Sequence, residues 1–298
     1  MEILARETLL SNVSTLMSVM AHNEYAMRPT KKDPRKIRDS KQPRNRIPPR
    51  DPRRRPQFSR ELSVLYEDDA VIVLDKPAGL LAVPIPGSNT PSALSLLTKK
   101  LEWKRQRPFI VHRIDRFTSG ALLFAKNGRD RDPLIKQFLA HTPVRQYLAV
   151  VRGCIENKSG TLVHHFRKEG PVQQLRTARD SRATRAELSY TVEQAFAEAT
   201  LVRVDLLTGL QNQIRAQFAA DGHPIIGDRK YNPAEASEKL ISRVALHAAH
   251  LEFIHPRTGE KISVDCKQPS DFQHLIQELS RSSRPRPSGP KTRANKGQ

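Results

Sequence analysis

The sequence predicts a soluble α+β domain over residues 61–280, and three observations support this prediction. Short β-rich runs and helical segments follow one another between Glu61 and Ser280 without the regular strand–helix–strand alternation of a parallel α/β fold. The chain has 298 residues, which is enough to bury a substantial hydrophobic core. Hydrophobic residues make up 37% of it, and no apolar run approaches the roughly 18–20 residues that a membrane span requires. We therefore expect a soluble protein that does not enter membranes.

The first half of this domain mixes strands and helices. Residues 71–75 (VIVLD) and 120–126 (GALLFAK) are rich in β-branched and apolar side chains and indicate strands. Apolar residues recur at helical spacing over 90–103 and 132–141, which predicts two helices. A third strand is expected over 145–153 (RQYLAVVRG), which ends on a glycine, a residue typical of element ends.

The second half contains further strands and two helices. Strands are expected at 186–195, 200–207, 245–255 and 261–266, and helices at 212–222 and 271–280. The residues HPRTGE at 255–260 contain Pro and Gly between the last two strands and predict a hairpin turn. Gly222 lies where the first of these helices should stop.

Most of the formal net charge of +20 lies outside the predicted domain. Residues 28–60 carry 14 Lys/Arg against three Asp, with seven prolines, and residues 281–298 carry six Lys/Arg and no acid. Both segments are expected to be disordered, because they hold too little apolar surface to offset the entropy of ordering. Basic arms commonly bind polyanions through counterion release, so they indicate RNA or DNA contact; a solubilising tail is the alternative. Residues 1–27 receive no role.

Several signatures of cofactor and metal chemistry are absent from the sequence. No G-x-x-x-x-G-K-S/T, G-x-G-x-x-G, H-E-x-x-H or G-x-S-x-G pattern occurs. His247 and His250 stand in a strand-like run without a third ligand nearby, and Ser119 lacks a glycine-framed turn, so we expect neither a metal site nor a serine nucleophile. Cys154 and Cys266 are too few for a disulfide framework, and a reducing compartment, the cytoplasm, is expected.

The polar segment HRIDRFTSG at 112–120 stands out because it directly precedes an apolar strand. Its Asp115 is flanked by Arg113 and Arg116. Neighbouring guanidinium groups favour the charged form of a carboxylate, which suits an ionised nucleophile rather than a general acid. An aspartate that stabilises its own turn through backbone amides is the alternative.

This segment resembles the catalytic motif of the RluA family of RNA pseudouridine synthases, His-Arg-Leu-Asp followed after three residues by Ser-Gly. Here the motif stands as His112-Arg113-Ile114-Asp115 and then Thr118-Ser119-Gly120. Four further segments resemble the family in the same order, namely 75–84 (DKPAGLLAVP), 145–153, 206–231 (LLTGLQNQIRAQFAADGHPIIGDRKY) and 246–260. The resemblance covers residues 62–275. Five segments that match in the family's order argue against coincidence.

The resemblance implies a fold and an activity. The fold would be a mixed, mostly antiparallel sheet with flanking helices and a central active-site cleft. The activity would be an isomerase that converts uridine to pseudouridine in structured RNA, with ribosomal RNA favoured over tRNA. No cofactor and no metal are expected, and we expect a monomer. Lys/Arg outnumber acids by seven to two over 99–116 and by six to two over 167–185, so these clusters are expected to bind phosphates; a solvated charged face is the alternative.

The resemblance also assigns roles to individual residues. Asp115 would act as the nucleophile or as an electrostatic base on the sugar–uracil unit, and Arg215 would pair with it and keep it ionised. Tyr147 would stack on the flipped uracil and assist proton removal from C5. Arg113, Thr118 and Ile214 would bind substrate, with Arg113 filling the space that the flipped base leaves. A surface helix arginine and a core aromatic are the structural alternatives for Arg215 and Tyr147.

The sequence departs from the family pattern Thr-Gly-Arg-x-His-Gln-Ile-Arg at two positions. Leu210 replaces the first arginine and Asn212 replaces the histidine. These changes motivate a rival function, an RNA-binding or ribosome-assembly factor of weak or no activity on the same fold. A nucleic-acid N-glycosidase that uses Asp115 is a second rival, distinguished by a free uracil product.

Overall fold

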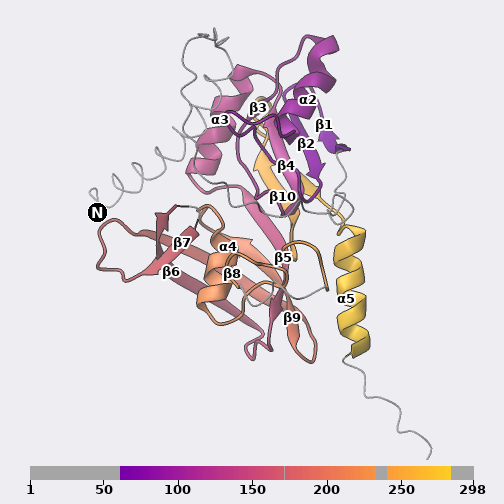
Figure 1. Ribbon diagram of the computed structural model, residues 1–298. Helices are drawn as coiled ribbons and strands as arrows, with labels where there is room; N and C mark the ends of the chain where they lie inside the picture. The colour runs from indigo at the N-terminus through magenta and orange to yellow at the C-terminus, as the bar shows by residue number, and fades with distance from the viewer. Residues whose placement is uncertain (1–60, 171, 233–239, 283–298) are drawn as a thin grey trace, which may run out of the picture. The chain divides into compact units, whose positions relative to one another are not determined.

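The computed structural model describes residues 61–170, 172–232 and 240–282, which form two compact units (Figure 1). In this described part the first unit comprises residues 61–116, Leu122–Thr142 and Ile254–Lys261. The second comprises Phe117–Ala121, Pro143–Phe253 and the chain from Ile262 onward. Strand β4 contributes residues to both units.

The first unit combines a short sheet with two helices. Its elements are β1 (Ser63–Glu67), β2 (Val71–Lys76), α2 (Ala93–Leu101), the 3-10 helix η2 (Glu102–Lys104), β3 (Phe109–Ile110), the later part of β4 (Ser119–Ala125) and α3 (Gly128–Leu139). β1 and β3 run antiparallel to β2 and β4 respectively, and β2 and β4 are neighbours. The sheet thus brings β2 and β4 together, and the loops that follow β2 and precede β4 carry two of the segments identified above.

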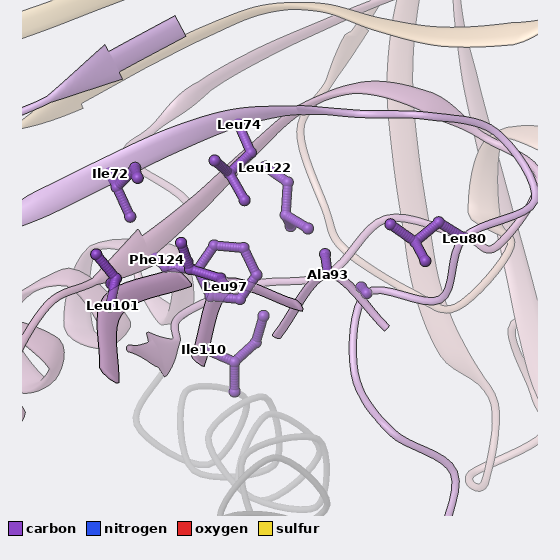
Figure 2. Packing of buried hydrophobic residues seen from close by; sticks show 10 residues of the cluster. Ile72, Leu74, Leu80, Ala93, Leu97, Leu101, Ile110, Leu122 and Phe124 are labelled. Atoms are coloured by element: carbon purple, nitrogen blue, oxygen red, sulfur yellow. The ribbon is translucent and has the colours of Figure 1, made fainter. Parts of the chain in front are cut away.

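One face of this sheet packs against helix α2 (Figure 2). Ile72 and Leu74 from β2 and Phe124 from β4 are fully buried with Leu97 of α2. Helix α2 begins at a capping box in which Ser92 and Ser95 exchange side-chain to backbone hydrogen bonds. Burial of each large aliphatic or aromatic side chain contributes about 1.5–3 kcal/mol, so this cluster contributes strongly to the stability of the first unit.

The second unit is built on an antiparallel sheet. Its elements are β5 (Val144–Arg152), β6 (Ser159–Glu169), β7 (Val172–Arg176), β8 (Thr184–Ala195), β9 (Ala199–Leu206), α4 (Gln213–Ala220), β10 (Leu246–Ile254), β11 (Lys261–Asp265) and α5 (Ser270–Ser282). The strand order is β10-β5-β9-β8-β6-β7, with every neighbouring pair antiparallel, and β11 pairs with β10. Helix α4 packs against β6, β7 and β8 (Figure 1).

The start of β4 pairs with β10 in parallel, at Ser119–His247 and Gly120–Ala248. Gly120 has a φ of +112°, and a Cβ atom there would lie 2.2 Å from the carbonyl oxygen of Ala248. Only glycine therefore allows the two backbones to approach this closely. This pairing makes the fold mixed and mostly antiparallel, which confirms the α+β prediction.

Each predicted strand and helix is present, with small shifts at the ends. The largest shift concerns α3, predicted from 132, which begins at Gly128 because the Asn127 side chain caps it by accepting a hydrogen bond from Asp130 N. Strands β1, β3, β6 and β7 were not predicted. β6 and β7 carry many polar side chains and pair mainly through their backbones, which gives little hydrophobic signal.

Part of the predicted domain plan lies outside the described residues. This applies to the segments 1–27 and 28–60, and to the predicted tail 281–298 beyond Ser282. The boundaries of the catalytic domain at 61–280 stay a prediction. Among the described residues, no helix has the length and apolar character needed to cross a membrane.

Candidate active site

Asp115 lies in the loop between β3 and β4, within the first unit. Its side chain is half-buried, whereas Arg113 and Arg116 on either side are exposed. Ile114 and Thr118 are buried at 5% and 2% exposure and anchor the loop to the protein interior. The loop therefore presents one carboxylate between two accessible cations, as the sequence predicts.

The chain after Asp115 is tied to the loop that follows β2. The carbonyl oxygen of Arg116 accepts hydrogen bonds from Gly79 N at 2.7 Å and from Lys76 Nζ at 3.2 Å. Arg116 Nε donates to the carbonyl oxygen of Gly79 at 2.9 Å. Lys76 is fully buried and also donates to the carbonyl oxygen of Leu80 at 2.9 Å. Sequence reasoning missed Lys76, although it lies in the segment DKPAG, because a lysine at a strand end gives no signal of burial.

The chain before Asp115 is held by His112. The Nε2 atom of His112 accepts a hydrogen bond from Leu123 N at 3.0 Å, and its ring stacks on Phe138 of α3 with centroids 4.4 Å apart. These contacts, together with those of Arg116, restrain the loop on both sides of the carboxylate. A restrained loop places a reactive group at low entropic cost during the reaction.

Tyr147 lies on strand β5 of the second unit, between β10 and β9, opposite Val204 of β9 and Ala248 of β10. Its side chain is 8% exposed, and Ala149 and Val151 on the same strand are also buried. The strand position confirms the predicted alternation of Tyr147 with apolar neighbours. Because Tyr147 belongs to the second unit and Asp115 to the first, their approach stays a prediction.

Arg215 lies in the first turn of α4 and is buried at 7% exposure. Its Nε and Nη2 atoms donate to Oδ2 and Oδ1 of Asp228, each at 2.7 Å. Its Nη1 atom donates to Asn212 Oδ1 at 2.9 Å. Arg215 is thus a buried, bidentate partner of Asp228 within its own unit, and the surface helix alternative is wrong. Its predicted pairing with Asp115 stays a prediction.

Asp228 is a functional candidate that sequence reasoning missed. It is fully buried, and its Oδ1 atom also accepts hydrogen bonds from Lys230 N at 3.0 Å and Tyr231 N at 3.2 Å. Gly227 before it has a φ of +77°, and a Cβ atom there would lie 2.0 Å from the carbonyl oxygen of Arg243. The sequence pattern that could have identified Asp228 is a Gly-Asp pair after an apolar run, which is typical of a tight turn.

The start of α4 is positioned by a line of buried polar side chains. Gln213 Oε1 accepts a hydrogen bond from Thr208 Oγ1 at 2.9 Å, and Gln213 Nε2 donates to Gln217 Oε1 at 2.9 Å. Gln217 Nε2 in turn donates to the carbonyl oxygen of Leu162 on β6 at 2.8 Å. Buried networks whose polar groups all have hydrogen-bond partners favour a single arrangement of the chain. Here the network fixes the position of the first turn of α4, which carries Arg215.

Arg145 supports the same loop from β5. Its Nη2 atom donates to the carbonyl oxygens of Leu206 at 3.0 Å and Thr208 at 3.3 Å. Burial lowers the pKa of its guanidinium, and the structure gives it no carboxylate partner among the described residues. Arg145 therefore stabilises the loop 206–208 through carbonyl groups. The sequence showed only a basic residue two positions before Tyr147.

The two departures from the family pattern have different structural roles. Asn212 has a φ of +57°, a left-handed conformation that asparagine tolerates well, and its side chain holds Arg215. Leu210 is half-buried against the apolar cluster of Phe166, Ala186 and Ala216. Asn212 thus takes part in the Arg215 network, whereas Leu210 contributes packing. Ile214 is 4% exposed and lies in the core, and its predicted contact with substrate stays a prediction.

Tyr231 completes the surroundings of Arg215. Its ring centroid lies 5.4 Å from the Arg215 guanidinium carbon, and its hydroxyl oxygen accepts a hydrogen bond from Gln173 N at 2.9 Å. Burial raises the pKa of Tyr231, so its hydroxyl stays protonated and adds no charge beside the ion pair.

Ser119 and His247 bond to each other instead of forming an accessible site. Their Oγ and Nδ1 atoms are 2.9 Å apart, and His247 Nε2 lies 3.0 Å from the carbonyl oxygen of Cys266. Both side chains are buried, at 2% and 0% exposure. His250 instead pairs with Asp265 at 2.7 Å. The contacts explain both histidines structurally and link β4, β10 and the chain after β11.

Comparison with known proteins places these segments in one family. The model of a family described as RNA pseudouridylate synthase matches residues 70–220. The chain is 36% identical to an uncharacterized RNA pseudouridine synthase of Bacillus subtilis over 74% of each protein. It is 32% identical to ribosomal large subunit pseudouridine synthase D of Zymomonas mobilis, over 75% of this chain and 74% of that protein. It is also 32% identical to tRNA pseudouridine synthase C of Haemophilus ducreyi, over 74% of this chain and 96% of that protein.

A solved structure shares the fold. The structure of human RNA pseudouridylate synthase domain containing 4 matches with a TM-score of 0.61 and 22% identity, over 73% of this chain and 92% of that chain. This likeness confirms the fold that the resemblance predicts.

Proposed function

This chain belongs to the RNA pseudouridylate synthase family and is an isomerase of its RluA type, and we propose that it modifies ribosomal RNA with Asp115 as its nucleophile. The reaction breaks the C1′–N1 bond of a uridine, turns the base and joins C1′ to C5. No atom is gained and no electron is transferred, so the proposal requires no cofactor. The observation that carries it is the restrained loop that presents the half-buried Asp115 carboxylate.

A carboxylate is suited to this reaction because cleavage of a glycosidic bond develops positive charge at C1′. Glycosidases use carboxylates to stabilise or capture such a centre. Asp115 is held between His112, which bonds Leu123, and Arg116, which bonds Gly79. The attacking group therefore keeps its position while the base turns.

Three other residues would support this chemistry. Tyr147 would stack on the uracil and assist proton removal from C5. Arg215, aimed by Asp228 and Asn212, would hold Asp115 ionised through a charge-assisted contact. Arg113 is exposed next to Asp115, which suits a side chain that fills the gap left by a flipped base. Thr118 and Ile214 would shape the substrate site from buried positions.

Two considerations bear on the choice of substrate, and the second favours ribosomal RNA. A relative of 32% identity is named for the ribosomal large subunit, although a relative of equal identity is named for tRNA. The basic segments 28–60 and 281–298 would favour a large folded RNA through counterion release. We place the enzyme in the cytoplasm as a monomer.

The test is carbodiimide mapping of pseudouridine in all stable RNAs, with and without this gene. We expect one or more uridines in ribosomal RNA to lose modification. Asp115→Asn should abolish isomerisation in single-turnover assays on that RNA while RNA affinity changes by no more than a few-fold. An active Asp115→Asn enzyme would refute the assignment of Asp115 as the nucleophile. A modified uridine in tRNA would refute ribosomal RNA as the substrate, and release of free uracil would indicate a glycosidase. An unchanged RNA map would favour the rival RNA-binding factor.

A further inference from the structure

The chain has one tryptophan, and the structure places it on the surface. Trp103 lies in η2 and is 77% exposed, more than any other large hydrophobic residue described. Tryptophan is usually well buried, because its side chain carries a large apolar area. A single indole held in solvent therefore requires a structural or functional reason.

The backbone beneath Trp103 is firmly anchored. Leu101, two residues earlier, is buried in the core against Phe124 and Leu97 (Figure 2). Arg105 N donates to the carbonyl oxygen of Glu102 at 2.9 Å, and Gln106 N donates to that of Leu101 at 3.3 Å. The indole is thus presented by a closed turn at the end of α2, and ordering it on a ligand costs little entropy.

Basic residues lie close to Trp103 in the sequence. Residues 99–107 contain five Lys/Arg and one acid, and all five cationic side chains are exposed. The Nζ atom of Lys104 lies 5.3 Å from the centre of the Trp103 ring. The guanidinium carbons of Arg107 and Arg131 lie 5.5 Å and 5.6 Å from the ring of Phe109, so cations also gather on the next aromatic side chain. The surface thus combines aromatic faces with cations.

We propose that Trp103, with Lys99, Lys100, Lys104 and Arg105, forms an accessory RNA-binding site in which the indole stacks on an unpaired base. The cations would bind the flanking phosphodiesters. Stacking suits any base because every base has a π-face, and unpaired bases are the ones that proteins reach in RNA. The site rests on the proposed function, since RNA is its ligand, but none of its residues lies in the five motif segments at 75–84, 112–120, 145–153, 206–231 and 246–260.

RNA suits this surface better than a protein partner does. The cores of protein interfaces are depleted in lysine, because its ammonium group is costly to desolvate. Here three lysines and two arginines lie within four residues of the indole. A polyanion keeps such cations paired while a base covers the ring.

The single tryptophan also makes the test specific, because all indole fluorescence of the full chain comes from Trp103. The probes are a single-stranded RNA of about 12 nucleotides and sodium polyphosphate, which carries charge but no bases. We expect RNA to quench the Trp103 emission. The dissociation constant from quenching should equal the one measured by fluorescence anisotropy of the same RNA carrying a label. Polyphosphate should bind with little quenching.

Variants of the full chain separate stacking from charge. Trp103→Ala should weaken binding of the labelled RNA by about tenfold, and Trp103→Phe should recover most of it. Val64→Ala is the matched control, because Val64 is another exposed apolar residue of the first unit, and it should change nothing. Lys104→Gln should weaken binding and reduce its salt dependence.

Three results would overturn the site. The first is quenching by polyphosphate as strong as that by RNA, and the second is an unchanged RNA affinity of Trp103→Ala. The third is a blue-shifted emission of the free protein that RNA does not alter, because this would mean that protein covers the ring. The binding assay needs no turnover, so we also apply it to Asp115→Asn. If pseudouridine mapping shows no change while RNA still quenches the Trp103 emission, the proposed catalytic function fails and the accessory RNA site stands. If mapping identifies a modified uridine while RNA does not quench the emission, the accessory site fails and the catalytic function stands.

Discussion

Replacing Asp228 with asparagine removes the carboxylate that holds the Arg215 guanidinium in the second unit. Asparagine has nearly the same shape and keeps one oxygen for the backbone N–H groups of Lys230 and Tyr231. Its amide nitrogen would face the Nε or Nη2 atom of Arg215, and two donors would then oppose each other. The variant therefore isolates the loss of the ion pair from any loss of packing.

The magnitude follows from the two hydrogen bonds of 2.7 Å between Arg215 and Asp228. Hydrogen bonds to charged groups contribute about 1.5–3 kcal/mol each, and removal of one partner of a buried ion pair costs about 3–5 kcal/mol. The two side chains are 8% and 0% exposed, so solvent offers little compensation. We expect the free energy of unfolding to fall by about 4 kcal/mol and Tm to fall by about 10 °C.

The assay combines urea unfolding with single-turnover isomerisation under conditions where the variant is folded. We expect Asp228→Asn to lower the rate of the folded enzyme as well as its stability, because Arg215 would no longer be aimed by a fixed partner. Asp271→Asn is the control, since Arg243 forms a bidentate pair with Asp271 in the same unit, and the Asp271 side chain is 41% exposed. It should reduce stability and leave the rate of the folded enzyme unchanged.

Two results would refute this reasoning. A loss of stability below about 1 kcal/mol would mean that the ion pair contributes no more than an exposed one. A normal isomerisation rate in folded Asp228→Asn would mean that Arg215 needs no positioning by Asp228.

Four further predictions concern other parts of the chain. Gly120→Ala should lower the free energy of unfolding in urea by about 3 kcal/mol or more, because a Cβ atom would clash with a β10 carbonyl oxygen. Gly128→Ala is the control and should be tolerated, because space exists for a Cβ atom there. Equal effects of the two substitutions would contradict this prediction. The pKa of Asp130 lies below its usual value, because hydrogen bonding to Arg257 and Asn127 outweighs the opposing effect of burial. Its stabilisation is complete above about pH 4 and is lost as the pH falls through the lowered pKa, which urea midpoints between neutral and acidic pH should show. Deletion of residues 28–60 should weaken RNA binding and flatten its dependence on salt, and an unchanged slope would exclude RNA contact by this segment. EDTA should leave isomerisation unchanged, and rescue by one specific ion would contradict the absence of a metal requirement.

Local patterns in the sequence were sufficient to predict the elements that later proved central. β-rich and helical periodicities identified β2, β4, β5, β9, β10 and α4, because these elements are buried on one or both faces and so carry a strong hydrophobic signal. Strands β6 and β7 gave no such signal, since half-exposed polar strands are held by backbone hydrogen bonds that leave no trace in composition.

The sequence by itself determined the resemblance to the family, the α+β class and the loop that carries Asp115, because motifs and periodicity are local properties of the chain. Only the tertiary structure showed that Asp228 pairs with Arg215, that buried Lys76 bonds the loop beyond Asp115, and that Trp103 stands in solvent. The physical reason is that burial and partnership depend on residues distant in sequence. A lysine, an aspartate and a tryptophan acquire their roles from neighbours that no local pattern specifies.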